Sequence, residues 1–246
     1  MNSRKQADRD LVYAEQREQV ASFVFDQRVA RVFSDMINRS VPGYASIIGM
    51  IGLLAARHAS SGSNLYDLGC SLGAASAAMR AALPIQDCHI LAVDNAPAMI
   101  ERAAGNLRIE PGVPVQLISA NVQDVLLRNA SVVVLNFTLQ FLPRNERLQL
   151  LRQIHQGMLD GGVLILSEKI AGADAREDAL LVDLHHAFKQ ANGYSELEIS
   201  QKRIALENVL LPETIAVHRE RLQAAGFSRV DLWFQCFNFV SFVARP

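Results

Sequence analysis

The chain has 246 residues, of which 50% are hydrophobic and 20% charged, a composition ordinary for one large α/β domain or two small ones. Its formal net charge of −1 provides no excess of positive charge of the kind that binds polyanions, so we expect no direct nucleic acid binding. Three cysteines without a C-x-x-C pair argue against a disulfide framework or a structural zinc site and predict a reducing compartment.

The N-terminal part of the chain divides into a polar arm and two helices. Residues 1–22 are crowded with charged and amide side chains and contain no apolar run typical of a secretory signal. We therefore expect a flexible arm, a single domain over residues 23–246 and a cytoplasmic location. Apolar side chains then recur at helical spacing, at Val29, Val32, Phe33, Met36 and Ile37. The longest apolar run, residues 44–56, is shorter than the roughly 20 residues that a bilayer span needs, which predicts a buried helix and no membrane segment.

From residue 64 onward, short apolar runs alternate with helical patterns. We expect strands over residues 64–69, 89–94, 114–119, 131–136 and 163–168, and helices over residues 73–83, 98–107 and 145–158. Such a series of strand–helix–strand units builds a parallel sheet that is buried on both faces.

The C-terminal part departs from this alternation. A helical insert is expected at about residues 170–210, followed by a helix over residues 212–225 that Gly226 closes. Strands over residues 230–236 and 239–244 are joined by a link too short for a parallel crossover, so they form an antiparallel hairpin. A mainly parallel α/β sheet that ends in a hairpin resembles the Rossmann-like fold of class I S-adenosylmethionine-dependent methyltransferases.

The sequence DLGCSLG at residues 67–73 lies where the first strand passes through a glycine-containing turn into a helix. Gly69 and Gly73 let the backbone approach a ligand, and the N–H groups of the helix face it. Asp67 would repel the pyrophosphate of a dinucleotide, whereas S-adenosylmethionine carries an ammonium and a sulfonium that favour this carboxylate. We therefore predict an S-adenosylmethionine site, the alternative being a tight turn without a ligand. Ser71 replaces the middle glycine of the pattern D-x-G-x-G-x-G, which leaves open how closely the backbone approaches a ligand there.

The ends of the next strands carry further polar candidates for cofactor binding. Asp94 ends the second strand, 25 positions after the first glycine of the motif, where an acidic side chain accepts both ribose hydroxyls. Its alternative role is to cap the next helix, although Asn95 can cap while Asp94 binds. Asn121 and Asp124 follow the third strand, where an adenine edge is usually read, and a plain polar loop is nearly as good an interpretation. Asn136 ends the fourth strand, at the edge where α/β sheets place ligands.

Two features of the C-terminal half have ordinary structural explanations. His185 and His186 are neighbours on a helix, so their rings point about 100° apart and make a poor metal pair, and we expect no metal site. Ser195 and Glu198 form a capping box that opens a helix carrying Arg203. From the residues alone, the default place of Arg203 is a solvated helix face.

Six blocks are too particular to reflect the fold alone: FD at 25–26 with VA at 29–30 and VF at 32–33, RSVPGY at 39–44, DLGCSLG at 67–73, VLNFTLQF at 134–141, NGYSELEISQKR at 192–203, and LWFQCFN at 232–238. Together they resemble the bacterial carboxy-S-adenosyl-L-methionine synthases from about residue 23 onward, whereas the arm before it is not matched. The resemblance implies a carboxyl-group transferase that converts S-adenosyl-L-methionine and prephenate to carboxy-S-adenosyl-L-methionine and phenylpyruvate. It also implies a homodimer and a functional link to a separate tRNA carboxymethyltransferase, which builds the 5-oxyacetyl uridine at the tRNA wobble position.

The resemblance also assigns roles to individual residues. The implied cofactor contacts are Tyr44, Gly69, Cys70, Ser71, Asp94, Asn95, Asn121, Val122, Asn136 and Arg203. Arg203 gains most, because a new carboxylate on the sulfonium methyl group needs a cation partner in a dry pocket. The family commonly has Asp in place of Asn121, which puts the adenine contact in doubt. The implied chemistry needs no protein base, because the hydroxide that leaves prephenate takes the proton from the activated methyl group.

Two other functions stay open at this point. The first is methyl transfer from S-adenosylmethionine to a small molecule, which analysis of the product would separate from carboxyl transfer. The second is a cofactor-binding partner without catalysis that docks the downstream tRNA enzyme, which turnover by the isolated chain would exclude.

Overall fold

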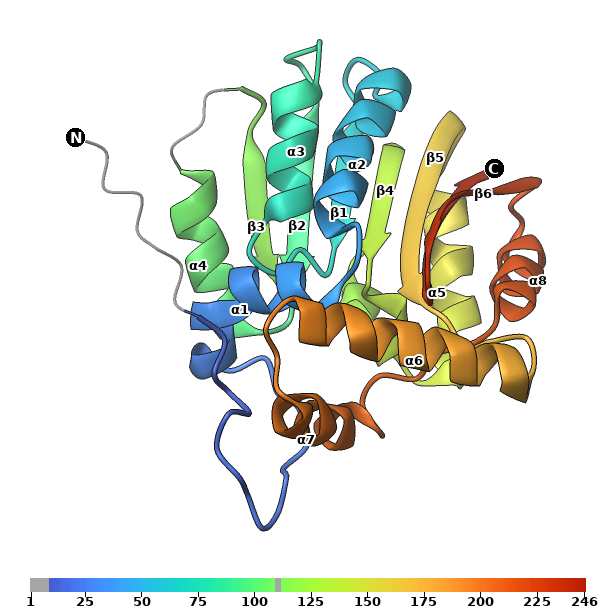
Figure 1. Ribbon diagram of the computed structural model, residues 1–246. Coiled ribbons are helices and arrows are strands. Elements are labelled where there is room, and N and C mark those ends of the chain that lie inside the picture. The colour runs from blue at the N-terminus through green and yellow to red at the C-terminus, as the bar shows by residue number, and fades with distance from the viewer. Residues whose placement is uncertain (1–8, 109–111) are drawn as a thin grey trace.

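The computed structural model describes residues 9–108 and 112–246, which form a seven-stranded sheet with helices on both faces (Figure 1). The strand order is β3-β2-β1-β4-β5-β7-β6. The strands are β1 (Asn64–Leu68), β2 (His89–Asp94), β3 (Val115–Ser119), β4 (Ala130–Asn136), β5 (Met158–Lys169), β6 (Arg229–Cys236) and β7 (Phe239–Arg245). The helices are α1 (Gln27–Ser40), α2 (Tyr44–His58), α3 (Ala74–Ala82), α4 (Pro97–Leu107), α5 (Arg144–Gly157), α6 (Ala175–Ala191), α7 (Glu196–Leu206) and α8 (Ile215–Ala225). Two short 3-10 turns, η1 (Val122–Asp124) and η2 (Leu139–Phe141), follow β3 and β4.

The direction of the strands confirms the expected fold. Strands β1 to β5 pair in parallel, and β7 pairs antiparallel with both β5 and β6. The central strand β4 is buried along its length up to Asn136, as a strand covered on both faces must be. The carboxyl ends of β1, β2, β4 and β5 therefore meet at one edge of the sheet, where such folds bind ligands.

Separate helices cover the two faces of the sheet. On one face α2 and α3 pack Ile47, Ile51 and Met79 against the strands, and each of these side chains is fully buried. On the other face α5 and α8 contribute a second core that includes Leu151 and Leu222. Among residues 9–108 and 112–246 no single helix is long and apolar enough to span a membrane, and α1 and α2 pass that test only as a pair bent by 98°.

A third group of helices, α1, α6 and α7, lies across the carboxyl edge of the sheet (Figure 1). The expected insert at 170–210 forms α6 and α7. Asp174 caps α6 by accepting the N–H groups of its first turn, and the predicted capping box of Ser195 and Glu198 opens α7. These caps fix where the two helices begin.

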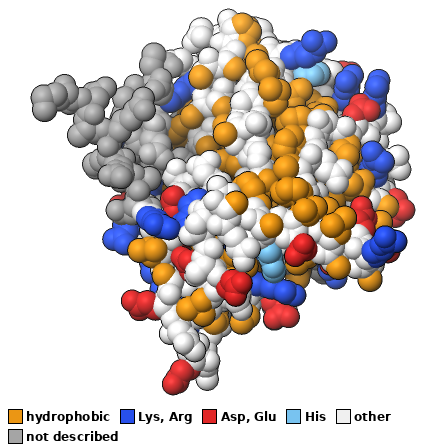
Figure 2. All heavy atoms as spheres, viewed as in Figure 1, with side chains coloured by type: hydrophobic (Ala, Val, Ile, Leu, Met, Phe, Trp, Pro, Cys, Tyr) orange, Lys and Arg blue, Asp and Glu red, His pale blue; other side chains and the backbone are white. Residues whose placement is uncertain are grey.

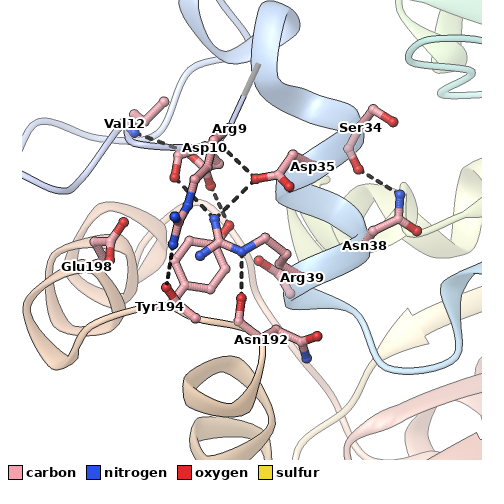
Figure 3. Close-up of polar contacts among 12 residues, drawn as sticks. Arg9, Asp10, Val12, Ser34, Asp35, Asn38, Arg39, Asn192, Tyr194 and Glu198 are labelled. Atoms are coloured by element: carbon pink, nitrogen blue, oxygen red, sulfur yellow. Dashed lines mark hydrogen bonds and ion pairs between the residues drawn. The ribbon is translucent and has the colours of Figure 1, made fainter. Parts of the chain in front are cut away.

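The described part of the expected arm, residues 9–22, has no helix or strand but packs onto α1 and α7. Asp10 is 1% exposed, accepts the hydroxyl of Tyr194 and lies 3.8 Å from Nζ of Lys202 in α7. Arg39 of α1 stacks on the Tyr194 ring with its guanidinium carbon 3.8 Å from the centroid (Figure 3). The sequence did not predict this packing, because the arm is polar and its charged residues pair with α1 and α7. Residues 1–8 lie outside the described residues.

Candidate active site

A cavity of about 560 Å³ lies at the carboxyl edge of the sheet, beneath α1, α6 and α7. Residues from separate segments of the chain meet on its wall. Apart from the adenine candidate Asp124, the predicted cofactor-binding residues line it: Tyr44, Asp67, Gly69, Cys70, Ser71, Asp94, Asn95, Asn121, Val122, Asn136 and Arg203. The fold thus brings together residues that are up to 159 positions apart, 203 minus 44, in the sequence.

The glycine-containing turn after β1 needs its two glycines for packing. Gly69 has a φ of +84°, and a Cβ there would lie 2.2 Å from Oγ1 of Thr138. Gly73 has a φ of +83°, and a Cβ there would lie 2.8 Å from Cδ1 of Leu107. Ser71 adopts a left-handed φ of 51°, which costs a residue with a side chain about 1–2 kcal/mol. Its N–H donates to Oδ2 of Asp94 at 2.9 Å, so this bond ties the strained middle position to β2.

Asp67 is almost completely buried at the end of β1 and still lines the cavity. Its Oδ2 accepts the backbone N–H of Ser76 at 2.9 Å and the Ser76 hydroxyl at 2.6 Å. Oδ1 takes no hydrogen bond from the described residues. Burial raises the pKa of this carboxyl to about 6, since the charged form lacks a cation beside it. The ammonium group of a ligand beside this carboxylate would offset the cost of burying its charged form.

Asp94 lines the cavity and also steadies the helix that follows it. Its Oδ1 accepts the N–H of Ala96 at 2.9 Å, which steadies the start of α4, and burial raises its pKa. Asn95 does not cap the helix: the N-cap is Ala96, and Asn95 donates instead to Oδ1 of Asn121 at 3.0 Å. The expectation that Asn95 caps is therefore wrong, because α4 begins one residue later than that role needs.

The loop after β3 is organised by its amides. Asn121 donates to Oδ2 of Asp124 at 2.9 Å, and Asp124 itself does not line the cavity. Asp124, which the sequence offered as a second adenine contact, therefore holds Asn121 instead of lining the cavity itself. At the end of β4, Oδ1 of Asn136 is buried and has no hydrogen-bond partner among the described residues. An orphaned acceptor on a cavity wall fits a site completed by a ligand.

The opposite part of the wall is basic and was only partly foreseen. Arg203 lies there as expected, and its side chain is exposed. Three lysines join it: Lys169, Lys189 and Lys202. Lys169 had a signal in the sequence, because it ends β5 at the ligand-binding edge. Lys189 had none, since a lysine inside a helix is ordinarily a solvated one.

Aromatic rings close the remaining wall. Phe25 from the segment before α1 packs edge to face on Phe33 of α1 and on Phe141 of η2, with centroids 6.1 and 5.3 Å apart. All three line the cavity. They join the N-terminal segment to the strand ends and keep water from the space between them.

The first of the two neighbouring histidines is buried against the end of α1. His185 points one ring nitrogen at the carbonyl of Ser40, 2.8 Å away, and burial lowers its pKa to about 3, so it is neutral. Within the described residues, no group of three His, Cys, Asp or Glu side chains is arranged to hold a metal ion.

Comparison with known proteins decides the family. A methyltransferase domain model matches residues 66–164. A carboxy-S-adenosyl-L-methionine synthase of Trichlorobacter lovleyi is 59% identical over 96% of this chain and 97% of its own length. One from Pseudomonas aeruginosa is 54% identical over 98% of this chain and 100% of its own length. The chain belongs to the carboxy-S-adenosyl-L-methionine synthase family. This confirms the resemblance of the six sequence blocks.

Solved structures with low sequence identity share the fold. Human N-acetylserotonin methyltransferase in complex with SAM matches with a TM-score of 0.62 at 16% identity, covering 89% of this chain and 55% of that one. A SAM-dependent methyltransferase of Leishmania major matches with a TM-score of 0.59 at 15% identity, covering 89% of this chain and 78% of that one. Together with the family, they establish a class I methyltransferase-type enzyme.

Proposed function

We propose that this enzyme makes carboxy-S-adenosyl-L-methionine from S-adenosyl-L-methionine and prephenate and releases phenylpyruvate. The observation that carries the proposal is the polarity of the cavity. Its strand-end wall presents Asp67 and Asp94, whereas the wall formed by α6, α7 and the end of β5 is basic. A cofactor with an ammonium and a ribose suits the first wall, and an anionic acid suits the second.

On the acidic wall we assign the cofactor contacts by chemistry. Oδ1 of Asp67 faces an ammonium, Asp94 accepts ribose hydroxyls, and the Asn95–Asn121 amide pair reads the adenine edge. Asn136 supplies an acceptor to a ligand donor, since its Oδ1 has no other partner among the described residues. Tyr44, Cys70 and Val122 complete the wall by contact.

Arg203 is assigned to the carboxylate of the product and is thereby the catalytic residue. Its guanidinium has no ion pair or hydrogen bond with any described residue, so it is available for two parallel bonds to a carboxylate. Burial beneath a bound ligand would supply the low dielectric in which this pair is strong.

The overall reaction balances without a protein base. S-adenosyl-L-methionine supplies a methyl group that the adjacent sulfonium acidifies. Prephenate loses carbon dioxide and hydroxide, the hydroxide and a methyl proton form water, and the carbon dioxide becomes the new carboxylate. The protein's part is to orient both substrates, exclude water with its aromatic wall and hold a fixed positive charge at the product carboxylate.

Turnover of the purified chain tests the proposal. With both substrates present, mass spectrometry should find a cofactor heavier by one carbon dioxide together with phenylpyruvate, and omission of prephenate should abolish both. Methylated products would favour the small-molecule methyltransferase instead. A chain that binds the cofactor and turns over nothing would favour the non-catalytic partner of the tRNA enzyme.

We also propose a cytoplasmic homodimer that hands its product to a separate tRNA carboxymethyltransferase. Hydrophobic side chains gather on the face that carries α2 and α6 (Figure 2). The exposed ones on these helices include Met50, Leu53 and Leu180, and Leu53 is 59% exposed. A patch of this kind suits a second copy of the chain.

A further inference from the structure

The basic wall holds more positive charge than the product carboxylate needs. Besides Arg203 it presents Lys169, from the carboxyl end of β5, and Lys189, from the last turn of α6. Lys189 is only 8% exposed. The ammonium groups of both lysines lack any ion pair or hydrogen bond with the part of the chain that the structure describes. Buried cations without a partner are costly, and they are retained where a ligand supplies the anion.

The charges around these lysines do not compensate them. Burial, followed by the neighbouring charges of Lys169, Lys202 and Arg203, lowers the pKa of Lys189 to about 7. Lys202 has its own acid, Asp10, and needs no ligand.

Burial and the charge of Arg203 lower the pKa of Lys169, whereas the carboxylate of Asp178 raises it. Of the remaining acids on the cavity wall, Asp67 and Asp94 belong to the strand-end wall, and Glu207 is exposed where α7 ends. Both neighbouring histidines, His185 and His186, have pKa values lowered by burial and add no negative charge.

We propose that Lys169 and Lys189 anchor the 2-oxo acid group of the second substrate, an assignment that rests on the function proposed above. Prephenate carries two carboxylates, and only one is lost as carbon dioxide. An ion pair to the departing carboxylate would stabilise the ground state and slow the reaction, so the cations belong to the carboxylate that stays. That carboxylate and its neighbouring ketone offer two acceptors to two ammonium groups. The ring then lies against apolar wall residues such as Phe137 and Phe239.

Phenylpyruvate keeps the 2-oxo acid group and is the probe of choice, because it binds without reacting. Calorimetric titration into the protein loaded with S-adenosylhomocysteine should show Lys169→Met and Lys189→Met binding it about thirtyfold or more weakly than wild type. Lys189→Arg should restore most of the affinity. Arg176→Met, which removes an exposed charge from the first turn of α6 outside the cavity, is the matched control and should bind like wild type.

Two readouts separate anchoring from a structural role. About one pH unit above the pKa of Lys189, wild-type binding should take up protons, seen by titration in buffers of different ionisation enthalpy, and Lys189→Met should lose this uptake. Ligand-free Lys189→Met should also unfold at the same temperature as wild type or higher, because it removes an unpaired buried charge.

Each contrary outcome overturns the assignment. These outcomes are phenylpyruvate affinity within about threefold of wild type in both methionine variants, an equal loss of S-adenosylhomocysteine affinity, or no phenylpyruvate binding by wild type. The result is also separable from the proposed function. If the lysine variants lose phenylpyruvate binding while wild type forms no carboxylated cofactor from prephenate, the oxo-acid site stands and the proposed reaction fails.

Discussion

At the scale of single residues, we expect Asp67 to make cofactor affinity depend on pH. Its pKa is raised to about 6, so the folded protein favours the protonated carboxyl and ionised Asp67 costs stability above that pH. A bound ammonium favours the ionised form instead. The affinity for S-adenosylhomocysteine should therefore be constant well above pH 6 and fall as the pH drops through about 6. Calorimetric titrations across this range check it, and Asp67→Asn should flatten the profile. A wild-type affinity that does not change with pH would separate Asp67 from the ammonium.

We expect Asp94 to have a ligand role beside its structural one, and two substitutions separate them. Asp94→Ala should weaken cofactor binding by about 1.5–3 kcal/mol for each hydrogen bond to the ribose that is lost. Asp94→Asn keeps an acceptor for the N–H of Ala96 and controls for the start of α4. If Asp94→Ala folds and binds the cofactor as wild type does, Asp94 is a helix cap only.

We expect Arg203 to decide which cofactor the site prefers. Arg203→Leu should bind S-adenosyl-L-methionine nearly normally, because that ligand has no group for this charge. Its preference for the carboxylated cofactor should fall by about 1.5–3 kcal/mol, the value of a charge-assisted hydrogen bond at a site that is open before ligand binding. Competition titrations with the two cofactors measure this difference. A variant that makes and retains the product at the wild-type level would return Arg203 to the solvated face of α7.

At the scale of elements, the N-terminal segment positions α7. Asp10 is the acid closest to Lys202, the residue before Arg203, and it also receives the Tyr194 hydroxyl (Figure 3). Asp10→Asn should lower the free energy of unfolding by about 2 kcal/mol, since it leaves a buried ammonium without its acid. It should also weaken retention of the carboxylated product. Urea titration checks the first effect, and Glu196→Gln, an exposed acid in the first turn of α7, should change neither.

The sheet was predictable from sequence because its strands are buried on both faces and read as short continuous apolar runs. Residues at strand ends, such as Asp94 and Asn136, were predictable for the same reason, since parallel strands gather their carboxyl ends at one edge. The boundary of β5 was less accurate: it starts at Met158, five residues before the expected 163, because Met158 already pairs with Ala130. Lys189 was not predictable, because its burial depends on α6 crossing the sheet edge, a tertiary placement without a local signal.

At the scale of the whole molecule, the patch on α2 and α6 should govern association. Leu53→Glu places a charge on that patch and should convert a dimer to a monomer in sedimentation velocity, with the cofactor affinity unchanged. Arg57→Glu, a polar position on the same helix, controls for the change in charge. A wild-type monomer, or a dimer that survives Leu53→Glu, would contradict this interface.

The near-neutral charge of the whole chain sets its expected relation to tRNA. With a net charge of −1, direct affinity for tRNA should be weak at physiological salt, because few counterions are released on binding. Filter binding decides it. Tight binding would point to direct action on RNA and away from a small-molecule product handed to another enzyme.

The origin of the transferred carbon tests the central claim most directly. Prephenate labelled with carbon-13 in its ring carboxylate should be supplied to the purified enzyme with unlabelled S-adenosyl-L-methionine, and the products followed by mass spectrometry. The account predicts that the label appears in the new carboxylate of the cofactor and that phenylpyruvate is unlabelled. An unlabelled carboxylated cofactor, or a methylated acid in its place, would contradict it.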